Sequence, residues 1–191
     1  MPAFAAIDRL RATAGLEVVY IGSRTGIERQ AAARAEVPYH AIRTGKLRRS
    51  RRRLGVVTWR NLADVLEVLW GTGQSLRLLV RMRPAVVLAT GGFVTVPVVW
   101  AARARRVPIV LHEQTVQFGL ANRLCAPAAT SIGLSTPLSL GSMQPRWRRK
   151  STVTGNPVRA AVLSGDADRA GAVGLGTWDP HSPRHWRRAR V

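Results

Sequence analysis

Three polar side chains, His112, Glu113 and Gln114, follow directly on the apolar run Ile109–Leu111. This pattern is typical of a buried parallel strand that delivers polar groups at its carboxyl end, where open α/β sheets bind ligands. A carboxylate beside an imidazole can hold or move a proton, and the amide can both donate and accept hydrogen bonds. The segment therefore predicts a ligand crevice of the kind an enzyme uses.

A second transition from strand to loop lies one unit earlier. Residues Ala85–Ala89 are apolar and run into Thr90, Gly91 and Gly92, after which Val94–Ala104 is predicted to be helical. Glycines there would let a phosphate group approach the backbone amides at the helix start. They are equally expected in a plain tight turn between a strand and a helix. Both interpretations stay open.

The elements that position these groups alternate between helix and strand. Periodicity predicts helices at Pro2–Ala14, Gly26–Arg34, Asn61–Arg81 (interrupted at 71–73) and Val94–Ala104, and strands at Glu17–Ile21, Val37–Ile42, Ala85–Ala89, Pro108–Leu111, Ser131–Leu134 and Thr152–Thr154. Alternation of this kind predicts an α/β protein with a Rossmann-like, doubly wound parallel sheet. The uncharged stretch 85–102 contains two glycines and Pro97, so no transmembrane segment is predicted.

Composition sets broad limits. The 191 residues are 46% hydrophobic, enough for one good core, and carry a formal net charge of +20. Among the lysines and arginines only Lys46 and Lys150 are lysine, as a GC-rich gene would produce, so only clustered charge such as Arg43–Arg53 is taken as functional. Such a cluster attracts phosphate-bearing substrates, acidic lipid or nucleic acid. Cys125 is the only cysteine, which excludes an internal disulfide, and it is expected to be a buried structural thiol.

The end of the chain differs from the rest. After about Gly165 neither a helical nor a strand period is visible, and Trp178 and Trp186 lie among scattered arginines. A nucleic-acid arm with stacking tryptophans would have this composition, but an out-of-frame or truncated end is favoured. Dispersed histidines predict no metal site, and no Gly-x-Gly-x-x-Gly turn follows a strand, which argues against a nicotinamide enzyme.

Four ordered motifs carry a resemblance to a known family. They are Ala89–Pro97, Leu111–Gln114, Gly119–Arg123 and Thr154–Arg159, which read ATGGFVTVP, LHEQ, GLANR and TGNPVR. In this order and spacing they resemble the N-terminal domain of the MurG family, the membrane-associated N-acetylglucosaminyltransferases of peptidoglycan synthesis. The resemblance covers roughly residues 2–163.

The resemblance implies a GT-B fold, in which two Rossmann-like halves face each other across a cleft and the N-terminal half binds the lipid acceptor and the membrane. The implied reaction moves N-acetylglucosamine, with inversion, from UDP-N-acetylglucosamine to the undecaprenyl-linked muramoyl pentapeptide (lipid I), giving lipid II. It implies no cofactor, no metal and no nucleic-acid partner. The implied location is peripheral, on the anionic cytoplasmic face of the bacterial plasma membrane.

Family roles carry over residue by residue. The resemblance implies that Glu113, beside His112, is a base or charge partner for the acceptor hydroxyl, although such a carboxylate is more often a structural hydrogen-bond acceptor. Thr115 stands where the family has an asparagine that contacts the nucleotide-sugar donor. Threonine keeps a hydroxyl but lacks the paired hydrogen-bond donor and acceptor of the amide. The implied donor-binding residues are Thr115, Asn156 and Arg159, and the implied acceptor-diphosphate residues are Gly91, Gly92 and Asn122.

An apolar and basic membrane patch is also implied. Apolar side chains on a helix beside arginines suit an interface with anionic lipid, whereas packing inside the domain explains the leucines almost as well. The residues of this patch are Leu66, Leu69, Trp70, Arg48, Arg49, Arg51, Arg52 and Arg53.

The sequence also departs from the family. It starts just after the strand and glycine-rich, histidine-containing turn with which the family opens, and it contains no counterpart of the nucleotide-sugar domain. We therefore expect residues 1–163 to form an acceptor- and membrane-binding domain without its first strand, and 164–191 an irregular basic tail. Little or no transferase activity and poor solubility are expected of this chain alone. The alternatives are an intact transferase whose reading frame is interrupted here, a non-catalytic lipid-binding fragment and, ranked last, a nucleic-acid binder.

Overall fold

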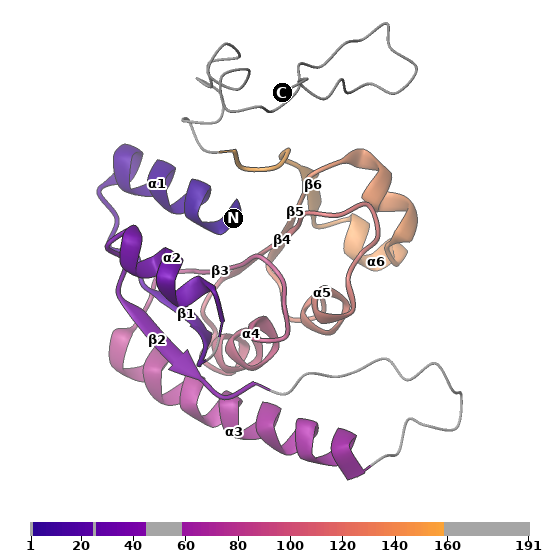
Figure 1. The fold of residues 1–191 in the computed structure, drawn as a ribbon. Helices are drawn as coiled ribbons and strands as arrows, with labels where there is room; N and C mark the ends of the chain where they lie inside the picture. The colour runs from indigo at the N-terminus through magenta and orange to yellow at the C-terminus, as the bar shows by residue number, and fades with distance from the viewer. Residues whose placement is uncertain (1, 25, 45–58, 159–191) are drawn as a thin grey trace, which may run out of the picture. The chain divides into compact units, whose positions relative to one another are not determined.

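The computed structural model describes residues 2–24, 26–44 and 59–158 (Figure 1). The chain divides into two compact units, residues 1–157 and 158–191, and the fold below is that of the first. The predictions for Arg48–Arg53, for Arg159 and for the tail 164–191 lie outside the described residues.

The described elements alternate as the sequence predicts. In chain order they are α1 (Pro2–Ala14), β1 (Tyr20–Ser23), α2 (Glu28–Arg34), β2 (Tyr39–Ile42), α3 (Trp59–Met82), β3 (Val87–Ala89), α4 (Thr95–Ala104), β4 (Ile109–Glu113), α5 (Leu120–Cys125), β5 (Ser131–Leu134), the 3-10 helix η1 (Pro137–Ser142), α6 (Pro145–Arg148) and β6 (Ser151–Val153). Every pairing is parallel, with β1 beside β2 in one sheet and the order β3-β4-β5-β6 in the other. The α/β expectation is confirmed.

The main core lies around the four-stranded sheet. Val99 of α4, Leu111 of β4 and Leu134 of β5 have no exposed surface, and Cys125 of α5 is equally buried. Figure 1 shows α4 and α5 on one side of the strands and α1 on the other. Burial on both faces explains why β4 reads as a continuous apolar run.

A smaller core joins α1 to the two-stranded sheet. Phe4 and Ile7 of α1 pack with Ala32 and Val37. The ring of Phe4 stacks on that of Tyr20, with their centroids 5.2 Å apart. Burial raises the pKa of the Tyr20 hydroxyl to about 12, so this group is neutral at physiological pH.

One expectation is wrong: α3 is not interrupted at residues 71–73 but continues through them. The backbone of Arg43 comes so close to Gly71 that an added Cβ would collide with the Arg43 carbonyl oxygen. The hydroxyls of Thr72 and Ser75 donate to carbonyls four residues earlier, at 2.8 and 2.7 Å, so both polar groups are satisfied within the helix, although such bonds slightly destabilise it. Close packing outweighs the low helix propensity of glycine here.

Two alanine substitutions in α3 are therefore expected to have opposite signs. Gly71→Ala should lower the free energy of unfolding by about 2–3 kcal/mol, because the new methyl group forces the Arg43 backbone away. Gly73→Ala meets no atom within 4 Å and should raise stability by up to about 1 kcal/mol through helix propensity. Urea unfolding of both variants checks this, and equal effects would contradict the packing argument.

Candidate functional site

Glu113, the last residue of β4, is the centre of the site, and its side chain is buried, with the residue 4% exposed. Its Oε1 accepts hydrogen bonds from the amide and the Oγ1 of Thr115, at 3.0 and 2.8 Å. Its Oε2 accepts from the amide of Gly119, at 2.8 Å, and from Nδ2 of Asn122, at 2.9 Å. The carboxylate therefore ties the end of β4 to the following loop and to the start of α5.

These hydrogen bonds also set the acidity of Glu113. Burial raises the pKa of the carboxyl, but the hydrogen bonds from Gly119, Thr115 and Asn122 to its charged form outweigh this, so its pKa lies below the usual value. A general base works best with a pKa near the working pH and with a free lone pair facing the substrate. The geometry favours a positioning role for Glu113 over the base role, which stays a prediction.

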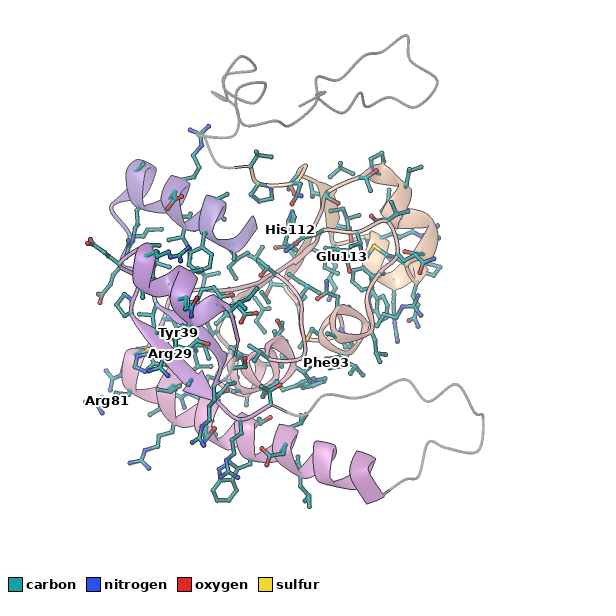
Figure 2. The ribbon with its side chains drawn as sticks, viewed as in Figure 1. Arg29, Tyr39, Arg81, Phe93, His112 and Glu113 are labelled. Atoms are coloured by element: carbon teal, nitrogen blue, oxygen red, sulfur yellow. The ribbon has the colours of Figure 1, made fainter. Side chains whose placement is uncertain are left out.

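His112 is buried next to Glu113 on the same strand, and Figure 2 labels the two side chains together. Its Nε2 lies 3.0 Å from the carbonyl oxygen of Gly155, so this nitrogen carries the proton and donates it. The bond ties β4 to the turn after β6, where Asn156 follows. Nδ1 is buried and has no hydrogen-bond partner among the described residues.

The turn after β3 contacts the residues that follow β4. Nε2 of Gln114 donates to the carbonyl oxygen of Thr90, at 3.1 Å. Gly91 and Gly92 have φ angles of +93° and +85°, which favour glycine. A Cβ on Gly91 would lie 3.5 Å from the amide group of Asn122, whose Oδ1 is buried and has no hydrogen-bond partner among the described residues. The ends of β3 and β4 and the start of α5 thus form one site.

Helix α4 starts at this site. Thr95 donates its hydroxyl to the carbonyl oxygen of Gly91, at 2.6 Å, and the N-cap residue Val94 makes no side-chain capping bond. The Thr95 and Val96 amides of the first turn donate to the carbonyl oxygens of Gly92 and Phe93, at 3.1 and 3.3 Å, and Pro97 has no amide hydrogen, so attraction for an anion here comes from the helix dipole. The predicted diphosphate contact of Gly91 and Gly92 is compatible with this geometry and stays a prediction.

Other predicted residues lie elsewhere. Asn156 is exposed in the turn after β6. Leu66, Leu69 and Trp70 lie on α3, and each is 60–63% exposed. They belong to a surface feature separate from the residues around Glu113.

The site also uses residues that the sequence did not indicate. Oγ of Ser139 donates to the carbonyl oxygen of Thr115, at 2.9 Å, and Oγ of Ser142 accepts from the amide of Phe118, also at 2.9 Å. Both serines belong to η1, more than twenty residues further along the chain. Nothing in their local sequence distinguishes them from ordinary loop serines.

Three expectations concern Cys125, metals and membrane spans. Cys125 is fully buried and burial raises its pKa to about 12, so the prediction of a buried structural thiol is confirmed. Within the described residues, no group of three or more metal-ligating side chains comes together. None of the helices in that part of the chain is both long and apolar enough to cross a bilayer.

Parallel strands alternating with helices, with polar groups gathered at the ends of two strands, define a Rossmann-like α/β domain of the GT-B glycosyltransferase type. Solved structures show the same fold. The Acinetobacter baumannii MurG structure matches with a TM-score of 0.64 at 22% identity, over 83% of this chain and 41% of that one. MnaA of S. aureus, solved with UDP, matches with a TM-score of 0.62 at 16% identity, over 88% of this chain and 45% of that one.

The chain belongs to the family described as the glycosyltransferase family 28 N-terminal domain, whose profile matches residues 1–134. A relative from Lachnoclostridium phytofermentans is 40% identical over 152 residues, which are 80% of this chain and 40% of that protein. A relative from Clostridium perfringens is 36% identical over 168 residues, 88% of this chain and 44% of that protein. Both are named UDP-N-acetylglucosamine--N-acetylmuramyl-(pentapeptide) pyrophosphoryl-undecaprenol N-acetylglucosamine transferase. The chain thus spans about two fifths of the length of these relatives.

Proposed function

We propose that this chain forms the acceptor side of an N-acetylglucosaminyltransferase. The complete reaction would move N-acetylglucosamine from UDP-N-acetylglucosamine to undecaprenyl-pyrophosphoryl-MurNAc-pentapeptide, with inversion at the sugar carbon. The observation that carries the proposal is the 40% identity over 152 residues to a relative whose name states this transfer. Because the chain spans 40% of that relative, the complete reaction is proposed for a protein of the relatives' full length.

The acceptor diphosphate is proposed to bind at the start of α4. Gly91 and Gly92 let phosphate oxygens come close to the backbone, because these residues carry no side chains. Together with the positive end of the helix dipole, they suit phosphate oxygens. The unpartnered Oδ1 of Asn122 adds an acceptor for a hydroxyl or amide hydrogen of the sugar.

Glu113 is proposed to be a positioning residue. It accepts four hydrogen bonds, from the amide and hydroxyl of Thr115, the amide of Gly119 and the side chain of Asn122, and so fixes the loop between β4 and α5. His112 would do the same for the turn that carries Asn156. Thr115, Asn156 and Arg159 are proposed donor-side residues on the resemblance.

Membrane attachment is proposed for one face of α3, on the cytoplasmic side of the plasma membrane. Leu66, Leu69 and Trp70 are well exposed there, and the guanidinium carbon of Arg43 lies 6.0 Å from the ring centroid of Trp70. An apolar surface beside a cation suits the interface of an anionic bilayer. Arg48–Arg53 would add charge from the neighbouring segment.

A pair of glycine variants tests the acceptor site. Gly92 and Gly15 both have positive φ angles, +85° and +58°, and an added Cβ would meet no atom within 4 Å at either. Each alanine variant should therefore lose a similar, small amount of stability, about 1 kcal/mol. Only Gly92→Ala places its methyl group where the acceptor diphosphate is proposed to bind. We expect it to weaken binding to zwitterionic vesicles that contain lipid I at least tenfold, while Gly15→Ala binds like the unsubstituted chain.

A second candidate is a membrane-binding domain that does not recognise the acceptor, favoured by the exposed face of α3 alone. It predicts equal binding of both glycine variants to vesicles with and without lipid I. That outcome would overturn the acceptor-site proposal and leave the membrane proposal intact.

A further inference from the structure

A polar pocket of about 590 Å³ lies at the carboxyl ends of β1 and β2, and its volume is in the range of small-ligand sites. Ser23 ends β1 and Ile42 ends β2, and both line the pocket. The lining also includes the loop after β1, the start of α2, and Arg43 with Glu67 of α3. In Figure 1 the end of β2 lies against α3. Open α/β sheets bind ligands at the carboxyl ends of their strands, so the pocket has the position of a binding site.

Two side chains of opposite charge line this pocket without pairing. Arg43 forms an ion pair with Glu67, at 3.6 Å, and among the described residues this is the only ion pair. Arg24 and Glu28, which also line the pocket, are therefore both unpaired in that part of the chain. Oε2 of Glu28 is buried and has no hydrogen-bond partner within the described ranges. A buried carboxylate oxygen without a donor is unfavourable, so the pocket suits a ligand that donates to Glu28 and accepts from Arg24.

The pocket adjoins the start of α4, where the acceptor diphosphate is proposed to bind. A Cβ added to Gly71 would meet both the carbonyl oxygen of Arg43 and, at 3.4 Å, the Cβ of Pro97 in the first turn of α4. Arg43 and Pro97 are thus neighbours across the same glycine. An extended chain covers about 3.4 Å per residue, so a pentapeptide of about 17 Å is long enough to reach the pocket from a sugar at the start of α4.

We propose that this pocket binds the peptide of the acceptor, with a carboxylate at Arg24 and a side-chain amino group at Glu28. The proposal rests on the proposed function, in which the acceptor is a muramoyl pentapeptide. A peptide joined to the muramoyl group through its amino end keeps a free carboxylate at the other end, which suits a guanidinium. Because the amino end is used for this link, the amino group must come from a side chain, so the peptide should contain a diamino acid. Ile27 also lines the pocket and is 72% exposed, which offers apolar surface to the methylene groups of such a side chain.

The test uses the full chain and the soluble pentapeptide Ac-Ala-Ala-Lys-Ala-Ala, whose acetyl group replaces the muramoyl link. One control peptide is acetylated on the lysine amino group, and a second ends in a carboxamide. An NMR titration follows the amides of Gly26 and Ile27 in the pocket, with that of Cys125 in the main core as reference. We expect each modification to weaken binding at least tenfold, and the Cys125 amide to stay unshifted throughout.

Matched variants assign the two charges. Arg24→Gln should bind the free peptide at least tenfold more weakly and should no longer distinguish the carboxylate from the carboxamide. Glu28→Gln should weaken binding similarly and no longer distinguish the lysine amino group from its acetylated form. The controls are Arg29→Gln and Glu36→Gln, at exposed residues that do not line the pocket, and both should bind like the unsubstituted chain.

Pocket amides that do not shift at millimolar peptide would overturn the proposal, and so would equal binding of the three peptides. Because the peptides carry no sugar, diphosphate or lipid, these outcomes are independent of the lipid I test of Gly92→Ala. A chain that recognises lipid I but not the peptide would lose this pocket alone. A chain that binds the peptide as expected but not lipid I would keep the pocket and lose the proposed acceptor site at α4.

Discussion

Replacing Glu113 with glutamine is expected to lower the free energy of unfolding by about 3 kcal/mol, the largest effect of any single substitution in the site. Each carboxylate oxygen of Glu113 accepts two hydrogen bonds, from Thr115 at Oε1 and from Gly119 and Asn122 at Oε2. Glutamine must put an NH₂ group in one of these two places, where it faces a backbone amide donor that cannot turn away, that of Thr115 or that of Gly119. Urea unfolding at pH 7 measures the loss.

Glu67→Gln is the matched control. Glu67 forms a single ion pair with Arg43, at 3.6 Å, and both side chains are close to half exposed. Exposed pairs of this kind contribute at most about 1 kcal/mol. A Glu113→Gln variant that is no less stable than Glu67→Gln would show that the carboxylate does not hold the loop, and the positioning role would be lost with it.

The same substitution should change how stability depends on pH. The pKa of Glu113 is lower in the folded chain than in the unfolded one, because the hydrogen bonds to its carboxylate outweigh its burial. Its contribution is therefore complete above the unfolded pKa, about 4.3, and is lost as the pH falls through the folded pKa. The difference in stability between the unsubstituted chain and Glu113→Gln should shrink between pH 5 and pH 3. A constant difference would mean that the carboxylate charge is not the cause.

Local sequence patterns predict many of the strands, helices and turns, because these elements depend on the side chains of neighbouring residues. An apolar run followed by polar groups, as in Ile109–Glu113, identifies both a buried strand and its functional end. The helices α1 and α4 were predicted within a residue of their observed bounds, and Gly91 and Gly92 as a strand-to-helix turn. These features depend on residues close together in the chain.

Features that depend on distant residues could not be predicted. The strand predicted at Glu17–Ile21 instead covers Tyr20–Ser23, because Gly22 and Ser23 pair with β2 and the absence of a side chain at Gly22 makes room for the Tyr39 ring. Residues 18 and 19, predicted as strand, are not part of β1 and have no strand partner among the described residues. Likewise, the hydrogen bonds between Ser139 and the Thr115 carbonyl and between the Phe118 amide and Ser142 each join residues 24 apart in the chain, which a local pattern does not show.

Removing the apolar side chains from the exposed face of α3 is expected to have the second large effect, on membrane binding. Leu66, Leu69 and Trp70 are each 60–63% exposed. Inserting them into a bilayer interface removes their apolar surface from water, which should contribute about 1 kcal/mol of binding free energy per side chain. The triple serine variant should therefore bind anionic vesicles about 100-fold more weakly, since every 1.4 kcal/mol is a factor of ten. Vesicle sedimentation gives the partition constants, and urea unfolding should show little change because the side chains are already exposed.

The apolar and electrostatic parts of this binding can be separated. Leu138 on η1 is as exposed as the leucines of α3, so Leu138→Ser is the matched control and should bind vesicles like the unsubstituted chain. Raising the salt concentration screens the attraction between arginines and anionic lipid but leaves apolar insertion in place. If the triple variant loses nothing at high salt, where the apolar part alone remains, then the face of α3 does not enter the bilayer and charge alone attracts this chain to the membrane.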